Sequence, residues 1–153
     1  MRVVSFLTAA AFLSCSCLAW SEEAPKSDPA KLVGTWNIVS GEDQGQAIPE
    51  DHIKGTTVRI TKDTITVLDR KDQQTYVVNY KLDPAKKPWT VTMMILDGPM
   101  KGKATSGILE LSGDDLKLCY ALPGEKAPAD FKVPAGSKQL LLVMKRARAG
   151  AEK

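Results

Sequence analysis

Histidine and cysteine, which supply many catalytic and metal-binding groups, are scarce in this sequence. Its 153 residues contain one histidine, His52, and three cysteines. A metal site with two or three imidazole ligands is therefore excluded, and any Ser-His-Asp arrangement has to use His52. That residue follows Glu50 and Asp51 in a polar stretch, which we interpret as solvated loop. Because the chain also lacks a Gly-x-x-x-x-Gly-Lys-Ser/Thr phosphate loop, we expect no enzyme activity, no catalytic residue, no metal and no cofactor.

Cysteine is also too scarce for a framework of disulfides. Cys15 and Cys17 lie near the start of the chain, which leaves Cys119 alone in the remainder. A single cysteine forms no internal disulfide, so the fold must be stabilised by packing. Because its strand neighbours are apolar, we expect Cys119 to be an unreactive packing residue.

The apolar run at the start of the chain, from Val3 to Leu13, is shorter than the roughly 20 residues of a membrane-spanning helix. It lies between Arg2 and a group of small residues that ends at Ala19, which is the order of a secretory signal peptide. We expect residues 1–19 to be a cleaved signal peptide. The mature protein is then exported, periplasmic or extracellular, without a transmembrane anchor.

A lipid anchor on Cys15 or Cys17 is the alternative interpretation of the same segment. Before Cys15, Leu13 stands where a small residue is expected, and the residues before Cys17 lack the leading leucine of a lipoprotein signal. We therefore favour cleavage after Ala19 without lipidation.

Charge of the two signs is nearly balanced, since 21 basic and 18 acidic residues give a formal net charge of +3. The basic residues are dispersed, and their local clusters are Lys86–Lys87 and Lys145–Arg148. Because they form no continuous stripe, we expect no nucleic-acid partner. We expect a monomer whose partner is a small molecule or a protein of the cell envelope.

The sequence does contain a series of short segments typical of strands. Residues 20–30 lack apolar periodicity and predict a flexible lead-in before a domain over residues 31–148. Within this domain, eight segments rich in β-branched and aromatic residues are each bounded by turn residues. They are Leu32–Ser40, Gly55–Thr61, Thr64–Asp69, Gln74–Leu82, Trp89–Leu96, Ala104–Leu111, Asp115–Ala121 and Gln139–Arg146.

The connections between these segments predict consecutive antiparallel strands. Short polar turns such as Thr61–Thr64 and Ser112–Asp114 have the length of hairpin loops. Two connections are longer, Gly41–Lys54 and Leu122–Lys138, and in the first of them Pro49–Ile53 is suited to one helical turn. We therefore predict an all-β fold: an eight-stranded antiparallel up-and-down barrel with two long loops.

Alternation along the segments assigns one face of each strand to the barrel interior. The opposite face carries polar residues such as Asn37, Thr92 and Lys117. The residues predicted to face inward are Leu32, Gly34, Trp36, Ile38, Val58, Ile60, Ile65, Val67, Tyr76, Val78, Tyr80, Trp89, Val91, Met93, Ile95, Leu116, Leu118, Tyr120, Leu140, Leu142 and Met144. So many large side chains predict a filled or narrow interior.

The first and last predicted strands carry a pair of motifs. Gly34 and Trp36 form a Gly-x-Trp, and Lys145 and Arg146 end the last strand. This pairing resembles the pattern of lipocalins and other calycins. The resemblance implies that the indole closes the base of the barrel and that a basic side chain lies across it, a cation–π contact worth about 0.5–2 kcal/mol.

A further set of motifs extends along nearly the whole chain after the lead-in. They are Leu32–Trp36, Tyr80–Pro84 with Lys87–Pro88, Asp97–Pro99 with Lys101–Lys103, Gly107–Ile108 with Glu110–Leu111, and Gly113–Ala121. The set resembles a family of short exported planctomycete domains that has no assigned function. The chain departs from the family at Leu109, where an aromatic is usual, and at Lys126–Pro128, where an Arg-Pro pair is usual. The resemblance implies the fold and export, and no activity.

Ligand binding is the function that these observations favour. An eight-stranded barrel is just wide enough to be filled by side chains or to hold one small ligand. We predict a non-catalytic binding domain with a small ligand in or at the mouth of a narrow barrel. The predicted ligand-binding residues are Tyr76, Tyr80, Met93, Tyr120 and Met144.

The alternative is a cell-envelope interaction or inhibitor module with a filled barrel. Its binding surface is then formed by the loops Gln44–Ile53 and Leu122–Gly136. A continuous apolar cavity above about 300 Å³ favours the small-ligand hypothesis. A filled barrel with an apolar patch on the loops favours the protein-binding hypothesis.

Overall fold

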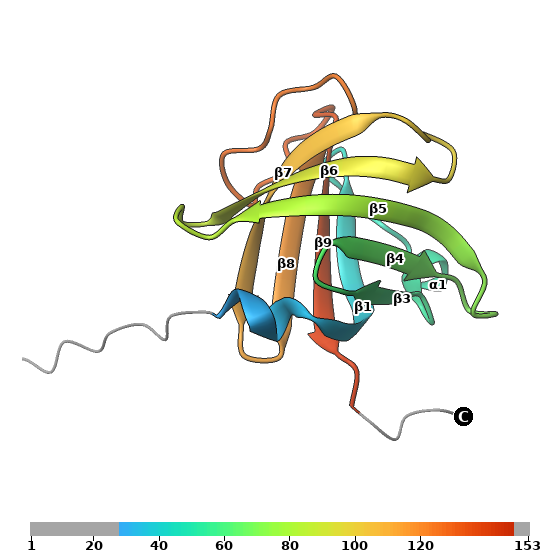
Figure 1. Cartoon of the computed structure of the whole chain (residues 1–153). Coiled ribbons are helices and arrows are strands. Elements are labelled where there is room, and N and C mark those ends of the chain that lie inside the picture. Colours follow the sequence, from blue (N-terminus) through green and yellow to red (C-terminus); the bar gives the residue numbers. More distant parts are fainter. Residues whose placement is uncertain (1–27, 149–153) are drawn as a thin grey trace, which may run out of the picture.

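Eight strands close into an antiparallel barrel in the computed structural model, which describes residues 28–148 (Figure 1). The described elements are a 3₁₀ helix (Pro29–Leu32), β1 (Gly34–Asp43), β2 (Gln46–Ala47), α1 (Glu50–Ile53), β3 (Thr57–Ile60), β4 (Thr64–Leu68), β5 (Gln74–Asp83), β6 (Trp89–Asp97), β7 (Ala104–Ser112), β8 (Asp115–Ala121) and β9 (Gln139–Arg146). The strands β3 to β9 follow chain order, and β1 closes the barrel by pairing with both β3 and β9. The predicted all-β fold, an eight-stranded antiparallel up-and-down barrel, is thereby confirmed.

The observed strand boundaries agree best with the predicted ones in the second half of the chain. β8 and β9 begin and end at the predicted residues. The first strand differs, because Leu32 belongs to the 3₁₀ helix and not to β1. β1 then continues past Ser40 to Asp43, into the segment predicted as loop.

The described structure begins inside the segment that the sequence predicts as a flexible lead-in. Asp28 caps the 3₁₀ helix by accepting a hydrogen bond from the backbone N–H of Ala30 at 2.9 Å. Leu32, the last residue of this helix, is fully buried and anchors it to the barrel. The end of the predicted lead-in is therefore part of the fold. Residues 20–27 and the predicted signal peptide, residues 1–19, lie outside the described residues.

The first long connection is bound to the barrel wall at two places. Its centre forms β2, which pairs back onto the end of β1. The helical turn expected within Pro49–Ile53 is observed as α1. The guanidinium of Arg70, which follows β4, donates a hydrogen bond to the carbonyl of Asp51 in α1 at 2.5 Å.

A β-bulge in β1 decides which residues near its end face the interior. The pairing with β9 skips one residue between Ile38 and Ser40, which leaves Val39 as an extra and exposed residue. Simple alternation from Ile38 places Glu42 inside the barrel. The bulge shifts the alternation by one residue, so Asp43 faces the interior and Glu42 faces outward.

Large apolar side chains fill the barrel from its closed end, which is the end that contains Trp36. Fully burying a side chain of this size contributes about 1.5–3 kcal/mol relative to leaving it exposed. Most of the predicted inward face is recovered here, with Leu109 and Leu111 of β7 and the partly buried Leu82 of β5 added to it. The buried members of this core cluster are Leu32, Trp36, Val58, Ile60, Ile65, Tyr80, Trp89, Val91, Met93, Leu109, Leu111, Leu116, Leu118 and Met144.

The second long connection, between β8 and β9, packs on the outer wall of the barrel (Figure 1, orange). Its Phe131 and Val133 contact Ile108, Cys119 and Leu141, which point outward from β7, β8 and β9. The sheet separates this smaller apolar cluster from the core inside the barrel. The apolar side chains of this loop therefore face the barrel.

Candidate binding site at the barrel mouth

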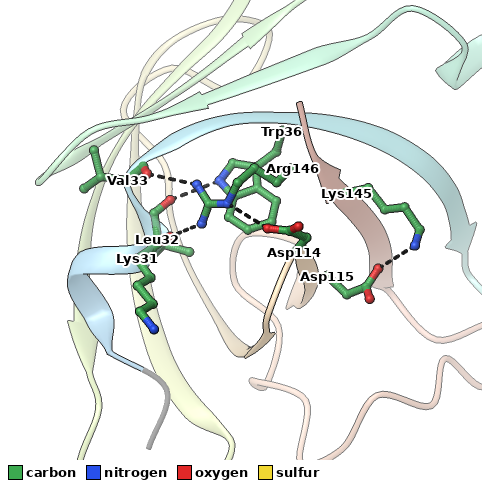
Figure 2. Close-up of polar contacts among 8 residues, drawn as sticks. All are labelled: Lys31, Leu32, Val33, Trp36, Asp114, Asp115, Lys145 and Arg146. Atoms are coloured by element: carbon green, nitrogen blue, oxygen red, sulfur yellow. Dashed lines mark hydrogen bonds and ion pairs between the residues drawn. The ribbon is translucent and has the colours of Figure 1, made fainter. Parts of the chain in front are cut away.

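The closed end of the barrel is sealed by Trp36 and Arg146 (Figure 2). The guanidinium carbon of Arg146 lies 4.3 Å from the centroid of the Trp36 ring. The indole N–H donates a hydrogen bond to the carbonyl of Leu32 at 3.0 Å, so the polar group of this fully buried residue is satisfied. Gly34 allows the close approach, because a Cβ there would lie 2.7 Å from Nη1 of Arg146.

Arg146 also ties neighbouring segments to this end of the barrel. Its guanidinium donates to the carbonyls of Val33, at 3.3 Å, and of Lys31. Its Nε lies 3.3 Å from Oδ1 of Asp114 in the turn between β7 and β8. These contacts use the planar array of donors that distinguishes arginine from lysine.

Lys145, the other basic residue of the predicted signature, has a different role. Its Nζ forms an exposed ion pair with Asp115 at 3.0 Å (Figure 2). It follows that Arg146 alone supplies the cation over the indole. This end is closed and fully engaged in contacts within the chain.

Three of the five predicted ligand-binding residues lie in the packed core. Met93 and Met144 are 5% and 1% exposed, and Tyr80 is 7% exposed. The Tyr80 hydroxyl donates to the carbonyl of Thr61 at 2.8 Å, and burial raises the pKa of this group with a smaller contribution from Asp63. These three side chains are packing residues in this structure.

The other two predicted residues, Tyr76 and Tyr120, lie near each other at the opposite end. We call this end, formed by Asp43, Tyr76 and Tyr120, the barrel mouth. Each tyrosine packs against a glycine: a Cβ on Gly98 would lie 2.7 Å from the Tyr76 ring, and one on Gly107 would lie 2.8 Å from Cβ of Tyr120. Because glycine has no Cβ, Gly98 and Gly107 leave the space that Tyr76 and Tyr120 occupy.

Asp43 is the member of the mouth that sequence reasoning missed. Across the sheet it pairs with Leu140 of β9, which pairs with Tyr120 of β8, so the three form one row on the inward face. Its Oδ1 is buried and has no hydrogen-bond partner within residues 28–148. In the sequence, Asp43 precedes Gln44-Gly45 and has the composition of a turn, and no local signal places it inside.

The side chain of Tyr120 is half-buried, and its hydroxyl has a raised pKa. Burial is the largest of the effects that raise its pKa from 10.0 to about 12, followed by the neighbouring Tyr76, the carboxylate of Asp43 and the thiol of Cys119. Tyr120 is therefore a neutral hydrogen-bonding group at neutral pH. The mouth thus combines the carboxylate of Asp43 with the phenol groups of Tyr76 and Tyr120.

The two long connections meet beside the mouth. The backbone N–H of Gly136 donates to the carbonyl of Gln44 at 3.0 Å, and the N–H of Gln44 donates to the carbonyl of Gln139 at 3.1 Å. Between these contacts lies Ser137, whose Oγ is buried. In the described part of the chain, Ser137 Oγ and Asp43 Oδ1 are the buried side-chain polar atoms without a hydrogen bond. Both belong to the same end of the barrel.

A separate depression of about 490 Å³ lies outside the closed end, where the 3₁₀ helix approaches β5. Tyr80 contributes to its lining, and the hydroxyl of this residue already donates a hydrogen bond to the carbonyl of Thr61. The lining has no buried unsatisfied atom. The mouth, which has such atoms, is therefore the stronger candidate. The depression is lined by Pro29, Ala30, Val33, Lys62, Tyr80, Lys81 and Leu82.

Residues 28–148 contain one cysteine and one histidine, Cys119 and His52. Cys119 is fully buried in the outer cluster, and burial raises its pKa to about 11, which keeps the thiol protonated and unreactive at neutral pH. No three His, Cys, Asp or Glu side chains of this region gather closely enough to hold a metal ion. The helices of the same region are too short and too polar to cross a membrane.

Fold and site together define a class of protein: a closed antiparallel β-barrel with a sealed base and a polar mouth. Comparison with family models, with curated proteins and with solved structures found no match. The functional argument therefore depends on the geometry of the mouth.

Proposed function

We propose that this chain is an exported, non-catalytic binding domain that holds one small ligand at the barrel mouth. The observation that carries the proposal is Asp43, which faces inward with a buried Oδ1 that no described residue satisfies. Folded proteins leave few buried polar groups unpaired, and each such group costs about 1–3 kcal/mol. A ligand that donates a hydrogen bond to Asp43 would offset this cost.

Packing below the mouth limits the size of the ligand. A long fatty acid would have to displace Tyr80, Met93 and Met144 from a filled core. Forcing extra volume into such a core costs about 1–3 kcal/mol, which corresponds to a tenfold to hundredfold loss of affinity. The domain is therefore proposed as a receptor for a short ligand at its mouth.

The position of the loop residues supports the small-ligand proposal over a protein-binding loop surface. Phe131 and Val133, the bulky apolar residues of the second loop, pack on the outer wall of the barrel. The exposed large apolar residues of the described chain lie on strands or beside the 3₁₀ helix: Val33, Val39, Met94 and Leu96.

We also propose that the protein acts in the periplasm or outside the cell, as the planctomycete-type domains that it resembles are expected to do. The support is the signal-like segment up to Ala19 and the ordered series of shared motifs. A ligand of an exported domain is a molecule that reaches the cell envelope.

Native mass spectrometry of the protein purified from its own host tests the proposed function. We expect a one-to-one complex with a small molecule that is lost on denaturation. We also expect palmitate to bind with micromolar or weaker affinity. Nanomolar one-to-one binding of palmitate, abolished by Met93→Trp, would contradict a site confined to the mouth.

A further inference from the structure

We propose that the ligand at the mouth is a small amphiphilic amine, whose ammonium group binds between Asp43 and the two tyrosines. This inference rests on the proposed function and adds the chemical class of the ligand. The observation behind it is that Asp43 presents a carboxylate to the interior while residues 28–148 supply no cation to meet it.

The distribution of basic residues leaves the negative charge of Asp43 at the mouth without a buried counter-charge. Within residues 28–148, the lysine and arginine side chains are exposed, with the exception of Arg146. Arg146 is engaged over Trp36 at the closed end. No basic side chain of this region is buried beside Asp43. The mouth therefore has a carboxylate that can bind a cationic ligand, and it has no buried basic group that could bind an anionic one.

Hydrogen bonding and aromatic faces favour the same ligand. A charge-assisted hydrogen bond from an ammonium to a carboxylate is about twice as strong as a neutral one. The electron-rich faces of Tyr76 and Tyr120 add a cation–π attraction when the cation lies within about 6 Å of a ring. A tyrosine phenol is neutral at neutral pH, and burial raises the pKa of Tyr120 further, so its hydroxyl is both a donor and an acceptor.

The geometry of the row limits the ligand to a small head group. Asp43 and Tyr120 are separated by one strand, so their Cα atoms lie about 10 Å apart across the sheet. Between them Leu140 offers an apolar surface, and Leu142 continues it toward the core. An ammonium group with a short aromatic or aliphatic body matches this combination of charge and apolar area.

Three probes of similar size and different charge test the inference: phenethylamine, 2-phenylethanol and phenylacetate at neutral pH. Each is titrated into the ¹⁵N-labelled protein, and amide shifts are followed at the ends of β1, β5 and β8. We expect phenethylamine to bind at the mouth at least about tenfold more tightly than either of the other probes, as the loss of one charged hydrogen bond implies.

Two variants of adjacent acids on β1 provide the matched comparison. Asp43→Asn removes the inward charge, and we expect it to abolish the preference for phenethylamine. Glu42→Gln removes the same charge from the outer face and should retain the preference. Thermal unfolding of both variants checks that they are folded, and the probe series on the unchanged protein stands independently of them.

The outcomes separate the inference from the function on which it rests. If all three probes shift the mouth resonances with similar affinity, or if Asp43→Asn keeps the preference, the amine assignment is wrong and the mouth remains a ligand site. If none of the probes shifts these resonances, both the assignment and the proposed site are overturned. A preference for phenylacetate would also overturn the assignment.

Discussion

A single arginine side chain joins three parts of the chain at the closed end of the barrel. Arg146 comes from β9, lies over Trp36 of β1, donates to carbonyls of the segment before β1 and reaches Asp114 in the turn before β8. Lys145, next to it, forms only an exposed ion pair. Neighbouring residues of like charge thus differ in role because they point to opposite sides of one strand.

Truncation of the indole measures how much this end contributes to stability. Trp36 is fully buried, so Trp36→Ala is expected to lower the free energy of unfolding by about 3–5 kcal/mol. The measurement is urea unfolding, with the exposed Val39→Ala as a control of small effect. A loss below about 1 kcal/mol for Trp36→Ala would contradict its role as the plug.

The two basic residues provide a second comparison. Arg146→Ala is expected to cost about 1–3 kcal/mol, because it removes the cation–π contact and the hydrogen bonds to the carbonyls of Lys31 and Val33. Lys145→Ala is expected to change stability by less than about 1 kcal/mol, as for other exposed ion pairs. The effect of Arg146→Ala should shrink in a Trp36→Ala background. Equal effects of the two single variants would show that the indole does not depend on Arg146.

At the scale of secondary-structure elements, irregular positions in the strands shape the mouth. The bulge at Val39 turns Asp43 inward, and Gly107 of β7 leaves room beside Tyr120 of β8. Gly98, after β6, does the same for Tyr76. Regular strands of the same composition would place these groups elsewhere.

Gly107→Ala tests this arrangement. The added Cβ would lie 2.4 Å from the carbonyl oxygen of Cys119 and 2.8 Å from Cβ of Tyr120, so the β7–β8 pair has to move. We expect a loss of about 1–3 kcal/mol in urea unfolding, typical of overpacking. The Tyr120 pKa should fall toward 10 in an absorbance titration as the hydroxyl becomes exposed. Ser106→Ala, on the same strand, is the control, and similar losses in both variants would argue against close packing at Gly107.

At the scale of the whole molecule, three buried acids link stability to alkaline pH. Burial raises the pKa of Cys119 from 9.0 to about 11 and that of Tyr120 from 10.0 to about 12, and it also raises the pKa of Tyr80. At a pH between the ordinary and the raised pKa of each group, the group is protonated in the folded chain and ionised in the unfolded chain. Their contribution is complete below about pH 9 and is lost as the pH rises to about 12.

Urea unfolding between about pH 8 and pH 11 measures this loss. For Tyr120, a rise of the pKa from 10.0 to about 12 corresponds to about 2–3 kcal/mol across the full range. Tyr120→Phe should therefore make stability less dependent on pH above about pH 10. A profile that stays flat up to about pH 11 in the original protein would contradict the burial of these groups.

Processing of the N-terminus is a further property of the whole molecule. We expect the mature protein to begin within a few residues of Trp20, with cleavage after Ala19 as the best fit and no acyl chain. Intact-mass measurement of protein from the envelope or the medium checks this prediction. A chain that begins at Cys15 or Cys17 and carries the added mass of a diacylglyceryl group would contradict the prediction and would show that the protein has a lipid anchor.

Local patterns in the sequence determined the number of barrel strands, their order and most of the inward face. Alternation with a period of two is a property of each strand alone, so Trp36, Tyr76 and Tyr120 were placed inside correctly. Short polar turns determined that consecutive strands are antiparallel. The Gly-x-Trp and the terminal basic pair located the closed end, which the structure confirms for Gly34, Trp36 and Arg146.

Only the tertiary structure decided which inward residues lie at the mouth and which fill the core. That distinction depends on register and on the position of each residue along the barrel axis, so Tyr80, Met93 and Met144 became packing residues while Tyr76 and Tyr120 reached the mouth. Asp43 faces inward because β9 pairs across the bulge in β1, a contact between residues far apart in the chain. Alternation in one strand contains no information about such a partner.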